Sequence, residues 1–256
     1  MTELAPIAIV PARLGSVRLR DKPLVDIGGA PLIQRVCENL EAAGLFGRIV
    51  IATEAERVAE VARRSGFEAV LTPADLPSGT DRVAAAARQL RLTGRQVVVN
   101  VQGDEPFVEP ASLAALLSAI APGERHVVSP IEALDPLELL HDPDVVKAVV
   151  GERGRALYFS RQAVPFVRAE GGASSPGLFN RHVGVYAYTC ETLQRLTDHP
   201  PHPLERAERL EQLRWLAHAE EIRCVRIEPS ARGIDTEEDR RRADAYYRTR
   251  HRPDDR

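Results

Sequence analysis

Short apolar runs alternate with longer stretches of helical pattern through the first half of the sequence, and this alternation restricts the possible folds more than any other feature. The apolar runs, rich in Val and Ile, lie at residues 7–10, 49–52, 69–71 and 97–101. Each is too continuously apolar for a half-exposed strand, so we predict strands that are buried on both faces of a parallel sheet. Apolar residues at helical spacing lie between these runs, at 31–43, 54–65 and 80–92. Ser78 or Thr80 is the expected cap of the third helix.

Strand and helix alternating in this order predict right-handed crossovers and a three-layer α/β sandwich with a Rossmann-like, mostly parallel sheet. In such sheets the ligand binds beyond the carboxyl ends of the strands. The second half has a looser pattern, with strands expected at 127–131, 145–150, 182–188 and 221–227 and helices at 204–217 and 236–248. We find no repeat and no linker, so residues 1–256 are predicted to form a single domain, with 251–256 as a disordered tail.

The composition disfavours several classes of partner. The 256 residues carry a net charge of −3, so no basic excess exists to hold a nucleic-acid backbone. No apolar run approaches the length of a membrane span, and the N-terminal residues do not resemble a signal peptide. Cys37, Cys190 and Cys224 are too scattered for a disulfide framework or a zinc site. We therefore expect a cytoplasmic protein that binds neither membranes nor nucleic acid.

The loop after the first predicted strand gathers positive charge. Arg13, Arg18, Arg20 and Lys22 lie close together there, where like charges repel unless an anion is held between them. This indicates a polyanion such as a triphosphate, with a solvated basic loop as the alternative. The three-glycine dinucleotide pattern and the Walker loop are both missing. Only two of the 34 basic residues in the chain are lysines, and a compact ammonium at position 22 suits phosphate oxygens better than a planar guanidinium.

Two acidic residues are candidate magnesium ligands. Asp104 follows Gly103 directly after the fourth predicted strand, where an α/β nucleotide enzyme places a metal carboxylate. The alternative for Asp104 is a turn in which its side chain bonds backbone amides. Asp235 lies in a similar context, and its alternative is the N-cap of the last helix with Glu238 as capping-box partner.

Ordered motifs along the chain resemble those of a known family. The first of them are the segments 9–13, 18–19, 22–24, 78–82 and 100–106, which resemble the bacterial CMP-sugar-acid synthetases. The segments 156–161, 181–186, 210–214 and 233–236 narrow the resemblance to the 3-deoxy-manno-octulosonate (KDO) cytidylyltransferase, or CMP-KDO synthetase, family. The resemblance covers residues 7 to about 239 and implies a fold of the nucleotide-diphospho-sugar transferase type.

The resemblance implies a nucleotide site and a metal site for CTP. The positions that match the family's nucleotide-binding residues are Ala12, Arg13, Lys22, Ser78, Gly79, Thr80, Arg82 and Gln102. Arg13 and Lys22 would bind the phosphates, and Asp104 and Asp235 match the ligands of Mg²⁺, the implied cofactor. These four residues form the expected catalytic set, because the reaction depends on positioning and charge neutralisation at the phosphates.

The resemblance also implies an acceptor pocket and a partner. The pocket for the sugar acid matches Gln102, Arg161, His182, Tyr186, Glu211 and Gln212. Arg161 suits the carboxylate by bidentate geometry. Without the family, His182 and Tyr186 are simply one face of a strand, and Glu211 and Gln212 the polar side of a helix. Residues 164–181 match a dimerisation arm, which implies a homodimer.

The implied activity is transfer of CMP from CTP to the anomeric hydroxyl of KDO with release of pyrophosphate, a step of lipopolysaccharide biosynthesis. Three alternatives stay open: the same transfer to another 2-keto sugar acid or a phosphonate, a nucleotide-sugar-dependent glycosyltransferase, and a non-enzymatic nucleotide-binding module. The chain departs from the family at Arg20-Asp21, where Pro-Gly is common, and at Leu76-Pro77, where polar residues are usual. The first departure puts the flexibility of the phosphate loop in question.

Overall fold

The structure is a computed structural model that describes residues 5–15, 18–120, 125–134, 137–168 and 177–250. The chain divides into two compact units. The first unit contains the residues up to Leu92, residues 98–110 and the residues from Ser230 onwards. The second unit contains residues 93–97 and 111–229. The predicted tail at 251–256 lies outside the described residues, and the prediction of a single domain stays a prediction.

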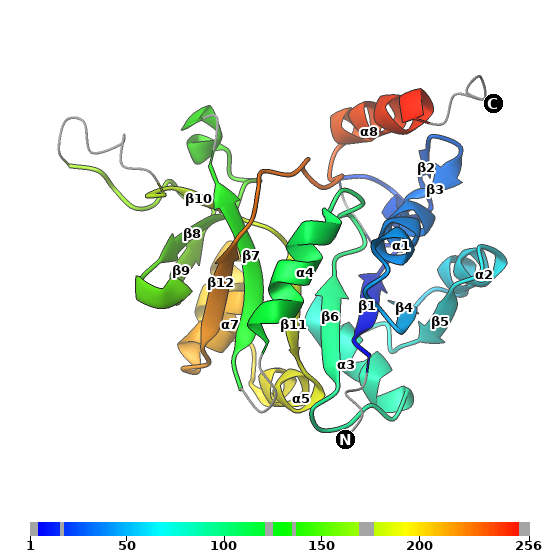
Figure 1. The fold of residues 1–256 in the computed structure, drawn as a ribbon, viewed down its shortest axis with the longest axis horizontal. Helices are drawn as coiled ribbons and strands as arrows, with labels where there is room; N and C mark the ends of the chain where they lie inside the picture. Colours follow the sequence, from blue (N-terminus) through cyan, green and yellow to red (C-terminus); the bar gives the residue numbers. More distant parts are fainter. Residues whose placement is uncertain (1–4, 16–17, 121–124, 135–136, 169–176, 251–256) are drawn as a thin grey trace. The chain divides into compact units, whose positions relative to one another are not determined.

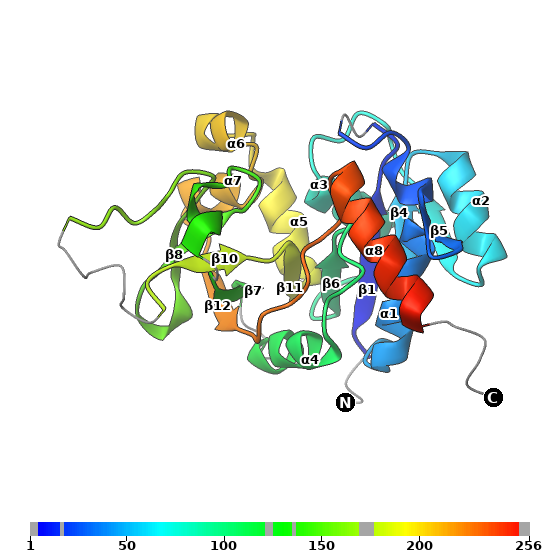
Figure 2. The same ribbon diagram turned by 90° about the horizontal axis from the view of Figure 1, so that it is seen from above.

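The first unit contains the predicted parallel sheet. Its strands are β1 (Ile7–Ala12), β4 (Arg48–Thr53), β5 (Glu68–Leu71) and β6 (Val97–Val101), in the order β5-β4-β1-β6 with parallel pairing throughout. Its crossover helices are α1 (Leu32–Ala43), α2 (Glu56–Arg64) and α3 (Gly79–Gln89). Right-handed crossovers place α1 and α2 on one face and α3 on the other, and Figure 2 shows α1 and α3 on opposite sides of β1. The strands and helices predicted for residues 7–92 are therefore confirmed.

The second unit is built mainly from antiparallel pairs. Its strands are β7 (Val127–Ala133), β8 (Lys147–Val150), β9 (Ala156–Ser160), β10 (Asn180–His182), β11 (Val185–Thr189) and β12 (Ile222–Arg226). The order is β11-β7-β10-β8-β9, and only β12 pairs in parallel, with β7 (Figure 1). Its helices are α4 (Pro110–Ala119), α5 (Cys190–Asp198), α6 (Pro203–Glu208) and α7 (Gln212–Ala217). Short 3-10 turns are η1 (Lys22–Leu24), η2 (Leu137–His141) and η3 (Glu152–Gly154), of which η1 belongs to the first unit.

The single helix predicted over residues 204–217 is wrong. Two short helices, α6 and α7, occupy this stretch, and Arg209 between them adopts the left-handed conformation with φ 53°. A capping box between His202 and Glu205 opens α6. Leu210 and Leu213, beyond the break, are both buried, so the apolar residues keep helical spacing across it. The sequence pattern alone therefore does not reveal the turn.

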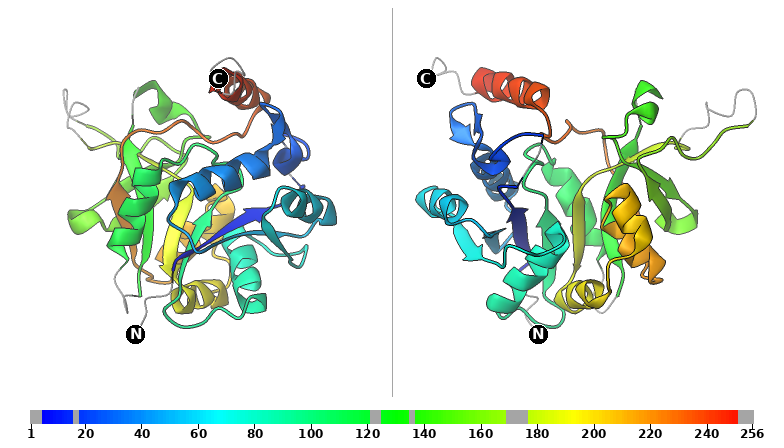
Figure 3. Two further views of the ribbon diagram at one scale, coloured as in Figure 1. Left: turned by 45° about the vertical axis from the view of Figure 1, so that its right-hand side comes forward. Right: turned by 180° about the vertical axis from the view of Figure 1, so that it is seen from behind.

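The last helix, α8 (Glu237–Arg250), packs on the hairpin formed by β2 (Asp26–Ile27) and β3 (Ala30–Pro31), beside the blue N-terminal segments in Figures 1 and 3. The amide of Gly28 donates to Asp244 Oδ1 at 2.8 Å. Gly28 has φ 61°, and a Cβ there would lie 2.5 Å from the Tyr247 Cβ, so only glycine fits this contact. The Tyr247 hydroxyl donates to the Pro106 carbonyl at 3.3 Å. These contacts return the C-terminal segment to the end of β6. None of the helices in the described ranges has the length and apolar character needed to cross a membrane.

Candidate functional site

Lys22, Asp104 and Asp235 meet in the first unit. The Lys22 Nζ lies 2.5 Å from Asp104 Oδ2 and 2.7 Å from Asp235 Oδ1. The lysine side chain is 12% exposed and the carboxylates are 32% and 38% exposed, so the cluster opens to solvent on the side of the acids. Arg18 Nη2 also lies 3.1 Å from Asp235 Oδ1. The two acids and the lysine predicted from separate motifs therefore form one cluster.

The backbone fixes the two acids beside each other. Gly103 precedes Asp104, and a Cβ at Gly103 would lie 2.9 Å from the Pro11 carbonyl oxygen, so the turn after β6 requires glycine to approach the end of β1. The Ile234 amide donates to the Asp104 carbonyl at 2.8 Å. At Gly233 a Cβ would lie 2.9 Å from that same carbonyl oxygen. Glycine on each side thus permits the close approach that places Asp235 next to Asp104.

The charges in this cluster reinforce each other. Burial lowers the pKa of Lys22, but the carboxylates of Asp104 and Asp235 raise it more, so the pKa lies above its ordinary value. Lys22 is therefore an ammonium at every physiological pH. A buried ammonium of this kind offsets the repulsion between two carboxylates that point at one position.

The donor set fits a magnesium ion. Two carboxylate oxygens converge on one point, and a positive charge, the Lys22 ammonium, lies at that point in this structure. Mg²⁺ commonly takes one or two protein carboxylates and completes its shell with phosphate oxygens and water. Among the described residues no group of three or more His, Cys, Asp and Glu side chains forms an alternative metal site. Asp104 and Asp235 are thus the residues suited to hold the ion.

The capping alternative for Asp235 is wrong. Thr236 caps α8, since its hydroxyl accepts from the Asp239 amide at 3.2 Å and Asp239 Oδ2 accepts from the Thr236 amide at 2.9 Å. The capping partner is therefore Asp239 and not Glu238. The Asp235 side chain is left to bind Lys22.

The N-terminus of α3 carries most of the remaining predicted nucleotide residues. Ser78 caps the helix by accepting from the Asp81 amide at 3.1 Å, as one of the two predicted caps. Gly79 and Thr80 begin the helix, where the helix dipole favours an anion. The Thr80 hydroxyl accepts from Asn100 Nδ2 of β6 at 3.1 Å.

Arg82 lies deep in the same helix turn. Its Nη1 donates to Thr72 Oγ1 at 2.6 Å and lies 3.2 Å from Glu54 Oε2. Burial lowers the pKa of Arg82, the Glu54 carboxylate opposes this, and the like charge of Arg13 adds to the lowering. Glu54 also accepts from the Leu14 amide at 2.9 Å, which ties the basic loop to this helix. Arg82 thus contacts Glu54, which in turn holds the basic loop at Leu14.

Gln102, Ala12 and Arg13 complete the nucleotide set. The side chain of Gln102 covers the start of α3, since a Cβ at Gly79 would lie 3.1 Å from its amide atoms. Ala12 is buried at the carboxyl end of β1, and Arg13, the next residue, is exposed. All eight predicted nucleotide-binding residues therefore belong to the first unit, at or near the carboxyl edge of its sheet.

The departure at Arg20-Asp21 has a physical explanation. Asp21 adopts the left-handed conformation with φ 51° just before η1. Asp and Asn enter this region more readily than other non-glycine residues. Asp21 thus makes the left-handed backbone turn after which Lys22 enters the cluster.

Five of the predicted acceptor residues lie in the second unit. Tyr186 donates its hydroxyl hydrogen to Gln212 Oε1 at 3.2 Å. The rings of His182 and Tyr186 have their centroids 5.5 Å apart. Glu211 is the N-cap residue of α7, next to Gln212. Tyr186, His182, Glu211 and Gln212 are thus neighbours in this unit, while Gln102 lies in the first unit.

The protonation of His182 follows from its partner. Ser129 Oγ donates its only hydrogen to the Val185 carbonyl at 2.8 Å, so it accepts from His182 Nε2 at 2.8 Å. Burial, with a smaller contribution from Arg181, lowers the pKa of His182 to about 3. His182 is therefore neutral near pH 7 and carries its proton on Nε2.

Arg161 is held by main-chain oxygens. Its Nε donates to the Glu208 carbonyl at 2.8 Å, and its Nη1 donates to the Pro143 carbonyl at 2.8 Å. The Glu208 carboxylate accepts from the Arg161 amide at 2.9 Å and from the Ser160 hydroxyl at 2.7 Å. A guanidinium fixed in this way keeps further N–H donors for an anion.

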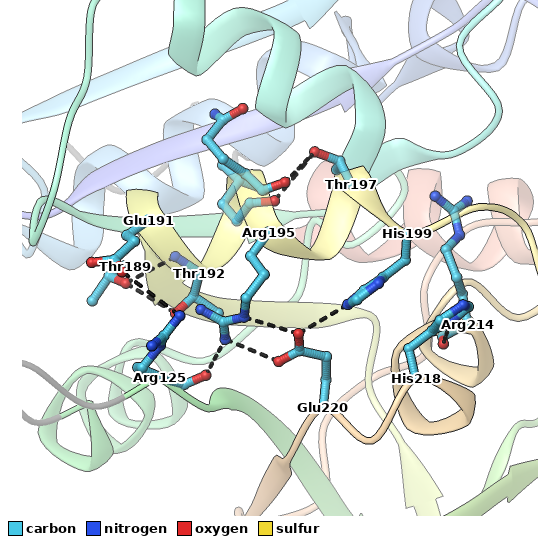
Figure 4. Close-up of polar contacts among 12 residues, drawn as sticks. Arg125, Thr189, Glu191, Thr192, Arg195, Thr197, His199, Arg214, His218 and Glu220 are labelled. Atoms are coloured by element: carbon cyan, nitrogen blue, oxygen red, sulfur yellow. Dashed lines mark hydrogen bonds and ion pairs between the residues drawn. The ribbon is translucent and has the colours of Figure 1, made fainter.

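A second polar cluster in this unit has no predicted role. Glu220 accepts from Arg195 Nε and Nη2, each at 2.9 Å, and lies 2.9 Å from His199 Nε2 (Figure 4). It connects α5 with the turn before β12. Among the described residues, the partners of Glu220 are Arg195 and His199, and neither is a predicted site residue.

Sequence reasoning missed several residues that support the site. They are Glu54, Asn100, Ser129 and Glu208, which contact predicted residues directly by an ion pair or a hydrogen bond. Asn100 carries a signal, since it is a polar residue inside a run of valines. The other three look like ordinary polar residues until the fold brings them to their partners.

A parallel sheet with two acids around a lysine at its carboxyl edge, beside a basic loop and a helix N-terminus, defines an α/β nucleotidyltransferase. The sequence model of the cytidylyltransferase family matches residues 7–222. The 3-deoxy-manno-octulosonate cytidylyltransferase of Gemmatimonas aurantiaca is 45% identical over 246 residues, 96% of this chain and 95% of the relative. The enzyme of the same name from Syntrophobacter fumaroxidans is 46% identical over 236 residues, 91% of this chain and 93% of the relative.

Solved structures agree with these relatives. The structure of CMP:2-keto-3-deoxy-manno-octonic acid synthetase complexed with CTP has a TM-score of 0.85 and 33% identity, and the match covers 96% of this chain and 99% of that chain. The chain therefore belongs to the cytidylyltransferase family. The predicted α/β fold class and the predicted family are both confirmed.

Proposed function

We propose that the chain transfers CMP from CTP to the anomeric hydroxyl of KDO and releases pyrophosphate. The observation that carries the proposal is the cluster of Lys22, Asp104 and Asp235 at the carboxyl edge of the parallel sheet. The names and high identity of the relatives support the same reaction. The KDO product places the reaction in lipopolysaccharide biosynthesis.

Phosphate binding falls to the basic loop and the start of α3. Arg13 is exposed next to Ala12, and Ser78, Gly79 and Thr80 present the amides of a helix N-terminus. Lys22 carries a fixed positive charge, and a point charge suits phosphate oxygens. Arg13 and Lys22 would stabilise the charge that develops on the departing pyrophosphate.

Asp104 and Asp235 would hold Mg²⁺. The ion, when bound, would polarise the α-phosphate and help to lower the pKa of the acceptor hydroxyl. Lys22 must then leave its position between the two carboxylates, and the phosphates of CTP offer its ammonium a new partner. The chain's own part in the transfer is positioning and charge neutralisation.

In the second unit, the acceptor would bind through Arg161, His182, Tyr186, Glu211 and Gln212. Arg161 is the partner for the sugar-acid carboxylate, since its guanidinium is fixed by two carbonyl oxygens and keeps free donors. Neutral His182 serves in shape and hydrogen bonding and does not act as a general acid near pH 7.

Residues 164–181 would form a dimerisation arm, and we propose a homodimer located in the cytoplasm. In the described part of the arm, Phe166 is 87% exposed, which is unusual for an aromatic side chain outside an interface. Residues 169–176 of the arm lie outside the described residues. Light scattering would test the assembly, and a monomer mass at working concentration would contradict it.

The same transfer to another small anion, a different 2-keto sugar acid or a phosphonate, is the second candidate, and the intact acceptor motifs argue against it. A pyrophosphate-release assay with CTP, Mg²⁺ and a panel of acceptors tests both candidates. We expect release with KDO at the highest kcat/KM. Release with a different 2-keto acid or phosphonate only would overturn the acceptor, and no release with any acceptor would overturn nucleotidyl transfer. Release that requires a nucleotide-sugar would indicate a glycosyltransferase.

A further inference from the structure

Lys147, one of the only two lysines of the chain, is completely buried in the second unit. Its Nζ donates to three main-chain carbonyls, those of Asp142 at 2.9 Å, Val145 at 2.6 Å and Arg161 at 2.5 Å. An ammonium has three hydrogens, so all of its donors are used. Lys147 therefore has neither a free donor nor an exposed atom for a ligand.

The three carbonyls belong to the two segments that frame the Arg161 guanidinium. One is the Arg161 carbonyl itself, and the others lie on either side of Pro143, whose carbonyl accepts from Arg161 Nη1. On the other flank the Glu208 carbonyl accepts from Arg161 Nε. Among the described residues, Nη2 has no hydrogen-bond partner. Within the described residues, the guanidinium is thus held at Nε and at Nη1, and its Nη2 donors are not used.

We infer that Lys147 is a positioning residue, which holds Arg161 and the 142–145 segment so that the Nη2 donors of the guanidinium bind the carboxylate of the acceptor. The inference rests on the proposed function. The carbonyls of Asp142, Val145 and Arg161 form a cage around the Lys147 Nζ. This carbonyl cage needs a cation at its centre, because three inward-pointing carbonyl oxygens without donors are costly to bury. The Lys147 ammonium therefore couples the positions of the three carbonyls to the orientation of Arg161.

A compact ammonium is required for geometric reasons. Its three hydrogens point to separate oxygens, whereas the planar guanidinium of arginine is larger and directs its donors in one plane. In a chain that otherwise uses arginine, the lysine at this position marks that requirement. Lys147→Arg is thus expected to fail in the same way as Lys147→Met.

The test compares kinetics for the two substrates. For Lys147→Met we expect the KM for KDO to rise by about tenfold or more, because the carboxylate contact is a charge-assisted hydrogen bond. The KM for CTP, and CTP binding measured by calorimetry, stay near wild type, since the nucleotide residues belong to the first unit. Leu193→Ala, which opens a cavity in α5 of the same unit, is the control for simple destabilisation and leaves the KM for KDO unchanged.

A double-mutant cycle with Arg161→Ala separates positioning from general structure. If Lys147 acts through Arg161, the loss from Lys147→Met disappears in the Arg161→Ala background. Full additivity of the two losses, or equal rises in the KM values of both substrates, would overturn the inference.

A second variant covers the case in which Lys147→Met does not fold. Pro143 is exposed, so Pro143→Gly loosens the 142–145 segment without emptying the cage, and a several-fold rise in the KM for KDO alone is expected. An unchanged KM for KDO would overturn the inference. Absence of turnover by the wild-type chain with CTP and KDO would instead overturn the proposed function.

Discussion

The Ile234 amide donates to the Asp104 carbonyl across 2.8 Å, which joins the segment before the last helix to the turn after β6. This main-chain contact, and not the acids themselves, sets the distance between the two carboxylates. The two carboxylates are therefore not needed to hold these segments together, and their replacement should leave the fold intact.

We expect Asp104→Asn and Asp235→Asn to reduce kcat by about a hundredfold or more, since each removes a charged oxygen from the proposed metal site. Pyrophosphate release at saturating Mg²⁺ measures the loss, and circular dichroism checks the fold. Glu238→Gln, on the exposed side of α8, is the matched control and should retain activity. Substantial turnover by either Asp variant would refute the assignment.

Replacement of Lys22 should have opposite effects on the metal and the nucleotide. Lys22→Met removes the ammonium between the carboxylates, so Mn²⁺ used as a probe should bind more tightly in the absence of CTP, by about tenfold or more. CTP binding should weaken, because a phosphate partner is lost. Calorimetry measures both.

Lys22→Arg keeps the charge and serves as the companion variant. We expect it to lose activity, because a planar guanidinium does not fit between two converging carboxylates. Wild-type kinetics in Lys22→Arg, or Mn²⁺ binding unchanged in Lys22→Met, would contradict the role given to this lysine.

The left-handed backbone at Asp21 predicts a simple ranking of stability. Asp21→Gly should be nearly neutral, since glycine adopts φ 51° without a steric penalty. Asp21→Val should lower the free energy of unfolding by about 1–2 kcal/mol, because a β-branched residue is disfavoured there. Urea denaturation measures both variants, and equal stability of the two would argue against this backbone conformation.

Glu220 should make stability depend on pH. Burial raises its pKa, but the hydrogen bonds from Arg195 and His199 lower it more, so the folded pKa lies below the ordinary value. Its contribution is then complete above the unfolded pKa of about 4.3 and is lost as the pH falls through the folded pKa. Glu220→Gln should cost about 1 kcal/mol at pH 7 and progressively less below pH 4.

Urea denaturation at a series of pH values checks this dependence. The control is Glu68→Gln, which removes the exposed ion pair with Arg48 and should change stability little at any pH. A Glu220→Gln effect that is the same at pH 7 and pH 3 would count against the ion pair as its source.

The sequence predicts the first unit better than the second for a physical reason. Parallel strands buried on both faces appear as continuous apolar runs, so β1, β4, β5 and β6 are visible without the fold. In the second unit, β9 and the helices α4 and α5 were not predicted, and the break at Arg209 lies inside an unbroken apolar spacing. A one-residue left-handed turn leaves no periodic signal.

Some features of the candidate site could likewise be predicted from the sequence, and others could not. Acids and bases at strand ends are visible because charge after a buried strand is unusual, which is why Lys22 and Asp104 could be predicted. That the Lys22 ammonium lies between Asp104 and Asp235 could not, since it depends on the packing of α8 against the β2–β3 hairpin. Whether Asp235 caps the last helix could not be predicted either, because it depends on which side chain accepts from the amides at the helix start.

The carbonyl cage around Lys147 has a practical consequence. Because this side chain is sealed from solvent, Lys22 is the only lysine of the folded chain that an amine-directed reagent can reach. Among the lysine side chains, acylation or reductive methylation would therefore report on Lys22 alone, inside the proposed triphosphate loop. The extent of labelling becomes a direct measure of whether that loop is occupied, without any change to the sequence.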